Sequence, residues 1–216
     1  MTEPDAPGRL VLRLPGTWVQ LDPRRREETA RRIRRYVELA VGRDDDRVRV
    51  RAGLRQALAA TMDVAGEDLQ SMLLCHEIAP GAPTPLSLSV LVPRDVRISP
   101  AIGTAPEAVI AGFHEAMQRI GDGEGWEQIP VSHGAAVRRW HVGEVALAPD
   151  ELGTVIRQVS VDVWRTVPRS KRLILVHADS VLADIPHTVV RLVDAIVGSS
   201  RVVPQTADRA PDVAPV

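Results

Sequence analysis

The sequence predicts an α+β fold in which an antiparallel β-sheet lies between helices. Three observations predict it. Valines alternate with polar residues over residues 154–167, as in a strand with one buried face. Apolar residues recur at helical spacing in several other segments. The strand-like segments follow one another in runs, with the helices segregated from them. This order indicates an α/β/α sandwich instead of a doubly wound parallel sheet.

The first elements are a strand and a helix. Residues 9–14 alternate towards leucine and predict the strand, and 18–21 continue it beyond a proline-glycine turn or bulge. Residues 24–41 place alanine, isoleucine and valine on one stripe at helical spacing and predict a helix. Gly42 is the expected C-terminal cap of that helix.

A second helix and two strands come next. Residues 46–65 carry apolar residues on one helical face, although the first of them, 47–51, also alternate like a strand. Residues 69–78 are apolar and are bounded by glycine and proline. Residues 86–92 alternate leucine and valine with serine. Both of these segments predict strands.

Two further helices are expected in the second half of the chain. Thr104 and Glu107 have the spacing of a capping box and predict a helix that runs to about residue 120. Residues 184–197 place valine, leucine and isoleucine on one stripe and predict the last helix. We expect Asp184 to cap its N-terminus, with a proline in the first turn.

Four strand-like segments lie between these two helices: 126–132, 135–148, 154–167 and 171–178. The third is the clearest, because its valines share one face while glutamine, serine and aspartate share the other. The link between the third and fourth segments is short enough to join them as an antiparallel hairpin. The four segments therefore predict a meander.

The length of 216 residues indicates a single domain with loose ends. The first residues are rich in proline and acidic side chains, and 204–216 contain three prolines and almost no bulky apolar residue. Such segments bury too little surface to offset the free-energy cost of ordering them. We expect a flexible N-terminus at 1–8, a single α+β domain at 9–201 and a disordered tail at 202–216.

The composition excludes several classes of protein. A net charge of −1 creates no field that would attract nucleic acid or a membrane surface. The longest apolar runs are a handful of residues, whereas a spanning helix needs about 20. Cys75 is the only cysteine, which excludes an internal disulfide and a cysteine-based metal cluster. The acidic N-terminus is not followed by an apolar stretch, so we predict no signal peptide and a cytoplasmic location.

Two segments of the chain resemble the PsbP-like α/β/α sandwich family. Residues 14–19, Leu-Pro-Gly-Thr-Trp-Val, look like the short strand that begins many members. The apolar strand at 172–176, followed by a loop and the helical segment 193–196, is similar to their last strand and last helix. The resemblance implies an antiparallel sheet between helices and a protein-binding role, and it supplies no catalytic residue.

The resemblance also implies a cellular setting. Similar proteins occur in actinobacteria, some of them beside type VII secretion genes. The chain has a single lysine, Lys171, and no asparagine, a composition typical of a GC-rich genome such as that of an actinomycete. Secreted relatives carry a signal and a lipid-attachment cysteine, and the lack of both here implies a location inside the cell.

Arginines crowd the first predicted helix, and five of them are candidates for an interaction surface: Arg24, Arg25, Arg31, Arg32 and Arg35. The arginine fork matches phosphate, an anionic lipid or an acidic protein. Glutamates on the same helix also fit a solvated helix face. Only one tyrosine, Tyr36, lies nearby and no aromatic residues are interleaved with the arginines, so stacking on bases is not predicted and no nucleic acid is expected. Both interpretations of the arginines are open.

Trp140 and Trp164 are candidates for interface anchors. Both fall in the polar phase of their predicted strands, and Trp164 lies opposite the valine face of 154–167. An outward tryptophan can anchor a partner protein. In a sandwich it can equally be covered by a helix. The sequence leaves these two interpretations open.

Ser160, Asp162 and His177 are the best candidates for a nucleophile with its base, because they lie on neighbouring predicted strands. No Gly-x-Ser-x-Gly motif supports a hydrolase, and polar neighbours on a sheet face usually bond to each other. His133 and His141 could face each other if a hairpin joined them. No spacing of histidines predicts a zinc site, and structural roles are favoured for all of them.

No nucleotide-binding motif is present. The glycines of 121–125 lack the Gly-x-Gly-x-x-Gly spacing and follow a helix instead of a strand, and there is no P-loop. We therefore expect no cofactor and no metal. The leading hypothesis is a non-catalytic accessory or protein-binding module, linked to type VII secretion or the cell envelope and of open oligomeric state. The alternatives are an enzyme whose site no motif marks, and an arginine-patch binder of anionic partners.

Overall fold

An antiparallel sheet forms the centre of the computed structural model, which describes residues 8–96, 98–99, 101–146 and 155–203. Eight strands make up the sheet, in the order β2-β3-β5-β9-β8-β7-β6, with the short β4 paired to β3. Their bounds are β2 Thr17–Leu21, β3 Leu69–Ala79, β4 Ala82–Pro83, β5 Leu86–Leu91, β6 Glu127–Ile129, β7 Ala136–Ala146, β8 Val155–Thr166 and β9 Leu173–Ser180. The predicted α+β fold is confirmed.

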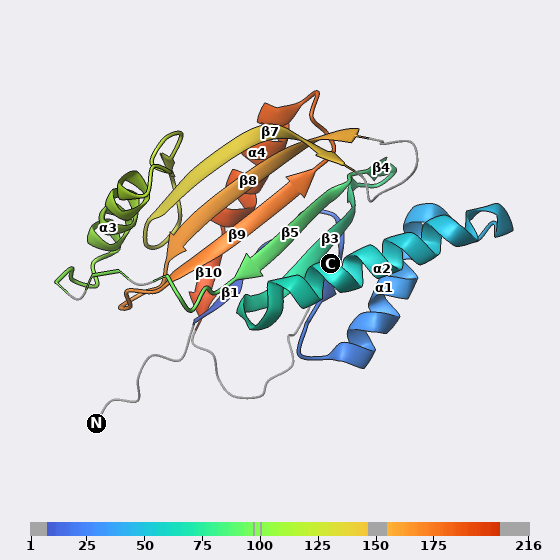
Figure 1. The fold of residues 1–216 in the computed structure, drawn as a ribbon, viewed down its shortest axis with the longest axis horizontal. Helices are drawn as coiled ribbons and strands as arrows, with labels where there is room; N and C mark the ends of the chain where they lie inside the picture. Colours follow the sequence, from blue (N-terminus) through green and yellow to red (C-terminus); the bar gives the residue numbers. More distant parts are fainter. Residues whose placement is uncertain (1–7, 97, 100, 147–154, 204–216) are drawn as a thin grey trace.

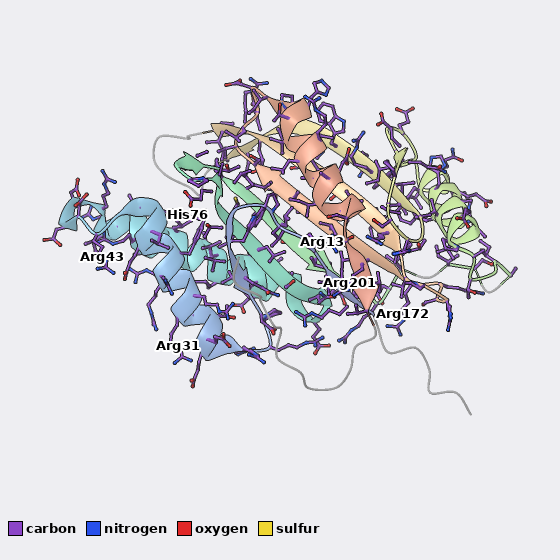
Figure 2. The ribbon with its side chains drawn as sticks, turned by 180° about the vertical axis from the view of Figure 1, so that it is seen from behind. Arg13, Arg31, Arg43, His76, Arg172 and Arg201 are labelled. Carbon is purple, nitrogen blue, oxygen red and sulfur yellow. The ribbon has the colours of Figure 1, made fainter. Side chains whose placement is uncertain are left out.

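Four α-helices flank this sheet: α1 Arg26–Val41, α2 Val48–Ala65, α3 Pro106–Arg119 and α4 Pro186–Gly198. Helices α1, α2 and α3 lie on one face, which is turned towards the viewer in Figure 1. Helix α4 lies on the opposite face and comes to the front in the reverse view of Figure 2. None of the helices in the described part of the chain is long and apolar enough to cross a bilayer.

The core under α4 follows directly from the alternation in β8. Val159, Val161 and Val163 are fully buried on this face, and they belong to the same cluster as Val193 and Ile196 of α4. Burying one such side chain contributes roughly 1.5–3 kcal/mol. A strand that alternates in this way can bury one row of side chains only if an amphipathic helix covers it, and α4 supplies that helix.

Smaller clusters hold the helices on the other face. Ile33 and Val37 of α1 pack with Met72 and Leu74 of β3, and Met62 of α2 completes this cluster. Helix α3 is held at the far end of the same face, where Phe113 packs on the side chains of Trp126 and Trp164. The three helices are therefore anchored at two separate places on the sheet.

Of the three predicted helix caps, Gly42 is confirmed as the C-cap of α1, and the two predicted N-caps are wrong. Helix α3 has Ala105 as its N-cap and Pro106 at its first position, and no side chain caps it, so Thr104 does not form a capping box. Helix α4 has Ile185 as its N-cap, and Asp184 forms an ion pair of 3.4 Å with Arg157 instead. In both helices a proline, which lacks an N–H and has a fixed φ, sets the first position.

The two ends of the described chain meet in a ribbon formed by β1 (Arg9–Val11) and β10 (Arg201–Val203). The first predicted strand is therefore shorter than expected. Val202 and Val203 belong to β10, so the domain extends past the predicted end at residue 201. The rest of the predicted tail, 204–216, lies outside the described residues, as do residues 1–7 of the predicted flexible N-terminus.

Candidate functional site

Polar side chains occupy the part of the sheet that the three helices on its front face leave uncovered. Helices α1 and α2 cover the β2 and β3 side, and α3 covers the far end, so no described helix lies over the middle of β9 and β8 (Figure 1). We call this area the open sheet face and define it by Ser87 and Ser89 of β5, His177 and Asp179 of β9, Gln158, Ser160 and Asp162 of β8, and His141 of β7. All are partly exposed or exposed.

Strand register places these side chains in two rows that cross four strands. The first row pairs Ser89 with His177, His177 with Asp162, and Asp162 with Arg139. The second row runs through Ser87, Asp179, Ser160 and His141. Directly opposite residues in an antiparallel sheet have neighbouring side chains on one face, so each row is a continuous line of neighbouring side chains.

His177 is held between two carboxylates. Its Nδ1 lies 2.7 Å from Oδ1 of Asp162, and its Nε2 lies 2.9 Å from Oδ2 of Asp179. The other oxygen of Asp179 accepts hydrogen bonds from Ser160, at 2.7 Å, and from Gln158, at 2.6 Å. Five side chains from two strands thus form one network, which we call the Asp-His-Asp cluster.

The network fixes the charge of its members. Hydrogen bonds to Asp162 and then to Asp179 raise the pKa of His177 to about 10, although burial opposes the shift. Burial acts to raise the pKa of Asp179, but the hydrogen bond and positive charge of His177, with the hydroxyl of Ser160, hold it below its usual value. At neutral pH the cluster is therefore an imidazolium between two carboxylates, with a net charge of −1.

This geometry does not form a catalytic triad. A serine nucleophile needs a neutral imidazole nitrogen that accepts its proton. The hydroxyl of Ser160 donates to Asp179, and both nitrogens of His177 already face carboxylates. The raised pKa also leaves His177 protonated, so it cannot act as a base near neutral pH. Within the described residues, no three His, Cys, Asp or Glu side chains form a group that could hold a metal ion.

The structure does not bring His133 and His141 face to face, although both belong to the hairpin of β6 and β7. Strand β6 pairs its residues Glu127 to Ile129 with the first three residues of β7, and His133 lies in the turn between them. His141 lies five residues beyond the start of β7, where strand rise carries it roughly 16 Å along the sheet. His141 instead pairs with Ser160 at the border of the open sheet face.

The five candidate arginines lie in α1 or just before it, and they do not act as one cluster of unpaired charges. Arg25 forms ion pairs with Asp22 and Glu28, and Arg32 bonds to Glu28 at 2.5 Å. Arg31 and Arg35 are exposed, and Figure 2 labels Arg31 on the outer side of the helix. Arg24 lies just before α1 and lines a pocket.

The two candidate tryptophans lie on opposite faces of the sheet. Trp164 packs against Phe113 of α3, with ring centroids 4.8 Å apart, and is covered by that helix. Trp140 pairs with Val161 on the α4 face and meets the ring of His187 at 5.1 Å. The prediction that Trp140 lies in the polar phase of its strand is therefore wrong, because the register of β7 against β8 places it on the same face as the buried valines.

The sequence interpretation missed Asp179, the residue that completes the cluster. It ended the predicted strand at residue 178, whereas β9 continues to Ser180. The signal was available, because His177 and Asp179 alternate with Ala178 and Ser180 in the pattern that marks the rest of the strand. Comparisons of the chain with protein-family models, curated proteins and solved structures find no significant match. The resemblance to PsbP-like proteins therefore stays a prediction.

Proposed function

We propose that the protein is a non-catalytic binding module whose open sheet face binds a partner protein. One observation carries the proposal: a continuous polar surface crosses the middle of the sheet, and the histidine at its centre, His177, is held as a cation between two carboxylates. Hydrogen-bonding groups held rigidly by a sheet suit recognition, because little side-chain freedom is lost when a partner binds.

The charge of the surface indicates the chemistry of the partner. Two carboxylates face one imidazolium, so the Asp-His-Asp cluster keeps a surplus negative charge. The hydroxyls of Ser87 and Ser89 form no hydrogen bonds within the described residues, and they border the cluster on β5. We therefore propose a partner segment that presents lysine or arginine together with amide groups to this face.

The two alternatives from the sequence receive less support. An enzyme centred on Ser160 would need a base, and the geometry around His177 supplies none. An arginine surface on α1 would need unpaired cations, and two of the five candidates are neutralised by neighbouring carboxylates. A cytoplasmic accessory role in type VII secretion or the cell envelope of an actinomycete is a further part of the proposal, and it depends on the resemblance alone.

The experiment places a photo-crosslinking amino acid at Ser89 and captures contacts in the native host. Gln56 is the matched control position, because it is exposed on α2 and its side chain forms no hydrogen bond or ion pair within the described residues. The captured protein is then tested for binding to purified S89R, which introduces a cation beside the cluster, and to Q56R. Circular dichroism establishes that both variants are folded.

We expect a protein that crosslinks from position 89 and not from position 56, and whose binding is lost in S89R and kept in Q56R. Repulsion between the new arginine and the cationic partner segment is the physical reason. A protein that binds S89R and Q56R equally would show that the open sheet face is not the interface. Failure to capture any protein from position 89 would also contradict the proposal.

A further inference from the structure

A pocket of about 610 Å³ lies where the beginning of α1 meets the end of α2. Its floor consists of Ile33, Met62 and Leu69, which are buried members of the cluster beneath the two helices. Ala30 and Ala59 form part of its apolar wall. The volume lies within the roughly 300–1,000 Å³ that small-molecule sites occupy, and a mainly apolar floor is typical of such sites.

The rim of the pocket is charged. Arg24, Arg26 and Arg94 line it together with Asp63 and Glu67. Three cations against two carboxylates leave a net charge of +1 on the rim. The pocket therefore combines an apolar floor with a cationic entrance.

Most of these rim charges already have partners. Arg94 pairs with Glu67 and reaches Asp68 at 3.8 Å. Arg26 forms no side-chain hydrogen bond or ion pair within the described residues. It is therefore the rim cation best placed to take an external anion.

The beginning of α1 adds to this cationic character. Arg25 is the N-cap, and no side chain caps the helix, so its first N–H groups lack a side-chain acceptor. The first turn contains two carboxylates, Glu27 and Glu28, and neither lines the pocket. Glu28 is neutralised by Arg25 and Arg32, at 3.2 Å and 2.5 Å. A helix N-terminus carries a partial positive charge and favours an anion beside it.

We propose that this pocket binds a small organic anion with an apolar body, such as a medium-chain carboxylate. The apolar body would lie on Ile33, Met62 and Leu69, and the carboxylate would face Arg26 at the beginning of α1. The inference goes beyond the proposed function, because the pocket shares no residue with the open sheet face and its ligand is a small molecule. Either proposal can fail without the other.

The experiment uses the full chain and octanoate as the probe, with binding followed by calorimetry and by amide NMR shifts. Octanol, which lacks the charge, and acetate, which lacks the apolar body, are the comparison ligands. R26Q removes the cation, and R31Q is its matched control, because Arg31 is exposed on the same helix and does not line the pocket. A59W fills the pocket with a bulky side chain.

We expect octanoate to bind more tightly than octanol or acetate and to shift amide signals around the pocket. R26Q should weaken octanoate binding by about tenfold, as expected for loss of a hydrogen bond to a charged group. R31Q should bind like the wild type, and A59W should not bind. Absence of octanoate binding to the wild type, or equal weakening by R26Q and R31Q, would overturn the proposal. Unchanged binding to folded A59W would do so as well.

Discussion

Ser160 directs its hydroxyl to Asp179, 2.7 Å away, although His177 lies beside it on the same face of the sheet. This choice of partner determines what the Asp-His-Asp cluster can do. A hydroxyl that donates to a carboxylate stabilises the charge of that carboxylate and is not activated as a nucleophile. The cluster is therefore a fixed arrangement of charges, and its chemical properties can be tested by titration.

Protonation of His177 should stabilise the fold over a defined pH range. Its pKa in the folded protein is raised from 6.5 to about 10, so the folded state binds this proton more tightly than the unfolded chain. The stabilisation is complete below pH 6.5 and is lost as the pH rises towards 10. We expect about 1–2 kcal/mol, because the side chain is 36% exposed and solvent screens the interaction. Urea unfolding at pH 6, 8 and 10 measures it.

The control for this titration is a variant without the imidazole. In H177Q the part of the pH dependence that arises from the cluster should disappear, so the free energy of unfolding should change less between pH 6 and 10. H141Q, at an exposed position one row away, should keep the wild-type pH profile. Identical profiles for H177Q and the wild type would contradict the assignment.

Removal of the two carboxylates should lower the pKa of His177 by different amounts. The hydrogen bond to Asp162 is the largest cause of the raised pKa, and the hydrogen bond to Asp179 is the next. We therefore expect D162N to lower the pKa of His177 more than D179N. An imidazole ¹⁵N NMR titration of the two variants checks this order, and a larger decrease in D179N would show that the two contacts are ranked wrongly.

Strand alternation in the sequence predicted which residues of the cluster share a face of the sheet, but not which of them bond to each other. Ser160 and Asp162 were placed opposite the valines of β8, and the short link after residue 167 made a hairpin that brings His177 close to them. Alternation cannot show which group bonds to which, because partner choice depends on side-chain rotamers in three dimensions. Ser160 therefore looked like a nucleophile until its contact with Asp179 was known.

The fold was more predictable than the details at the ends of its elements. Long periodic segments such as β8 and α1 carry many residues that agree with one structure, so their type is well determined. Strands β4 and β10 have two and three residues, too few to show a period. The covering of Trp164 by α3 depends on a contact with Phe113, about 50 residues away, which no local pattern records.

Arg165 should contribute strongly to stability even though no carboxylate pairs with it within the described residues. Its side chain is buried, and it donates to the carbonyl oxygens of Val197, at 3.0 Å, and His133, at 2.9 Å, and to the hydroxyl of Ser200. The contact with Val197 places a cation at a carbonyl of the last turn of α4. R165M keeps much of the volume but removes the donor to the carbonyl of His133, while the carbonyl of Val197 keeps its hydrogen bonds from Ser200. We expect a loss of about 2–4 kcal/mol.

Chemical unfolding of R165M measures this loss, with R157M as its control. Arg157 forms an exposed ion pair with Asp184, and such pairs contribute little. R157M should therefore lie within about 0.5 kcal/mol of the wild type. Equal stability of R165M and the wild type would mean that methionine compensates by apolar burial, as it can at buried charged sites.

Phe113 should anchor α3 to the sheet. It is 1% exposed and contacts the rings of both Trp126 and Trp164. F113A removes this contact and leaves a cavity, which should lower the free energy of unfolding by about 3–5 kcal/mol. Tryptophan fluorescence should also shift to longer wavelength, because water then reaches the two indoles. V64A, at a position that is 89% exposed on α2, should change neither quantity.

Gly16 should tolerate no side chain, for two separable reasons. Its φ is +76°, a backbone conformation that favours glycine, and a Cβ there would collide with the backbone oxygens of Glu77 and Ile78 in β3.

Gly121 has nearly the same φ, +78°, but no atom lies within 4 Å of its would-be Cβ. G121A therefore measures the backbone strain alone, at about 1–2 kcal/mol. G16A adds the collision, which forces β2 away from β3, and we expect a total loss of about 3 kcal/mol or more. Chemical unfolding measures both variants. Equal losses of unfolding free energy would show that β2 can move away from β3 at no cost, so that the close approach of Gly16 to β3 does not fix the position of β2.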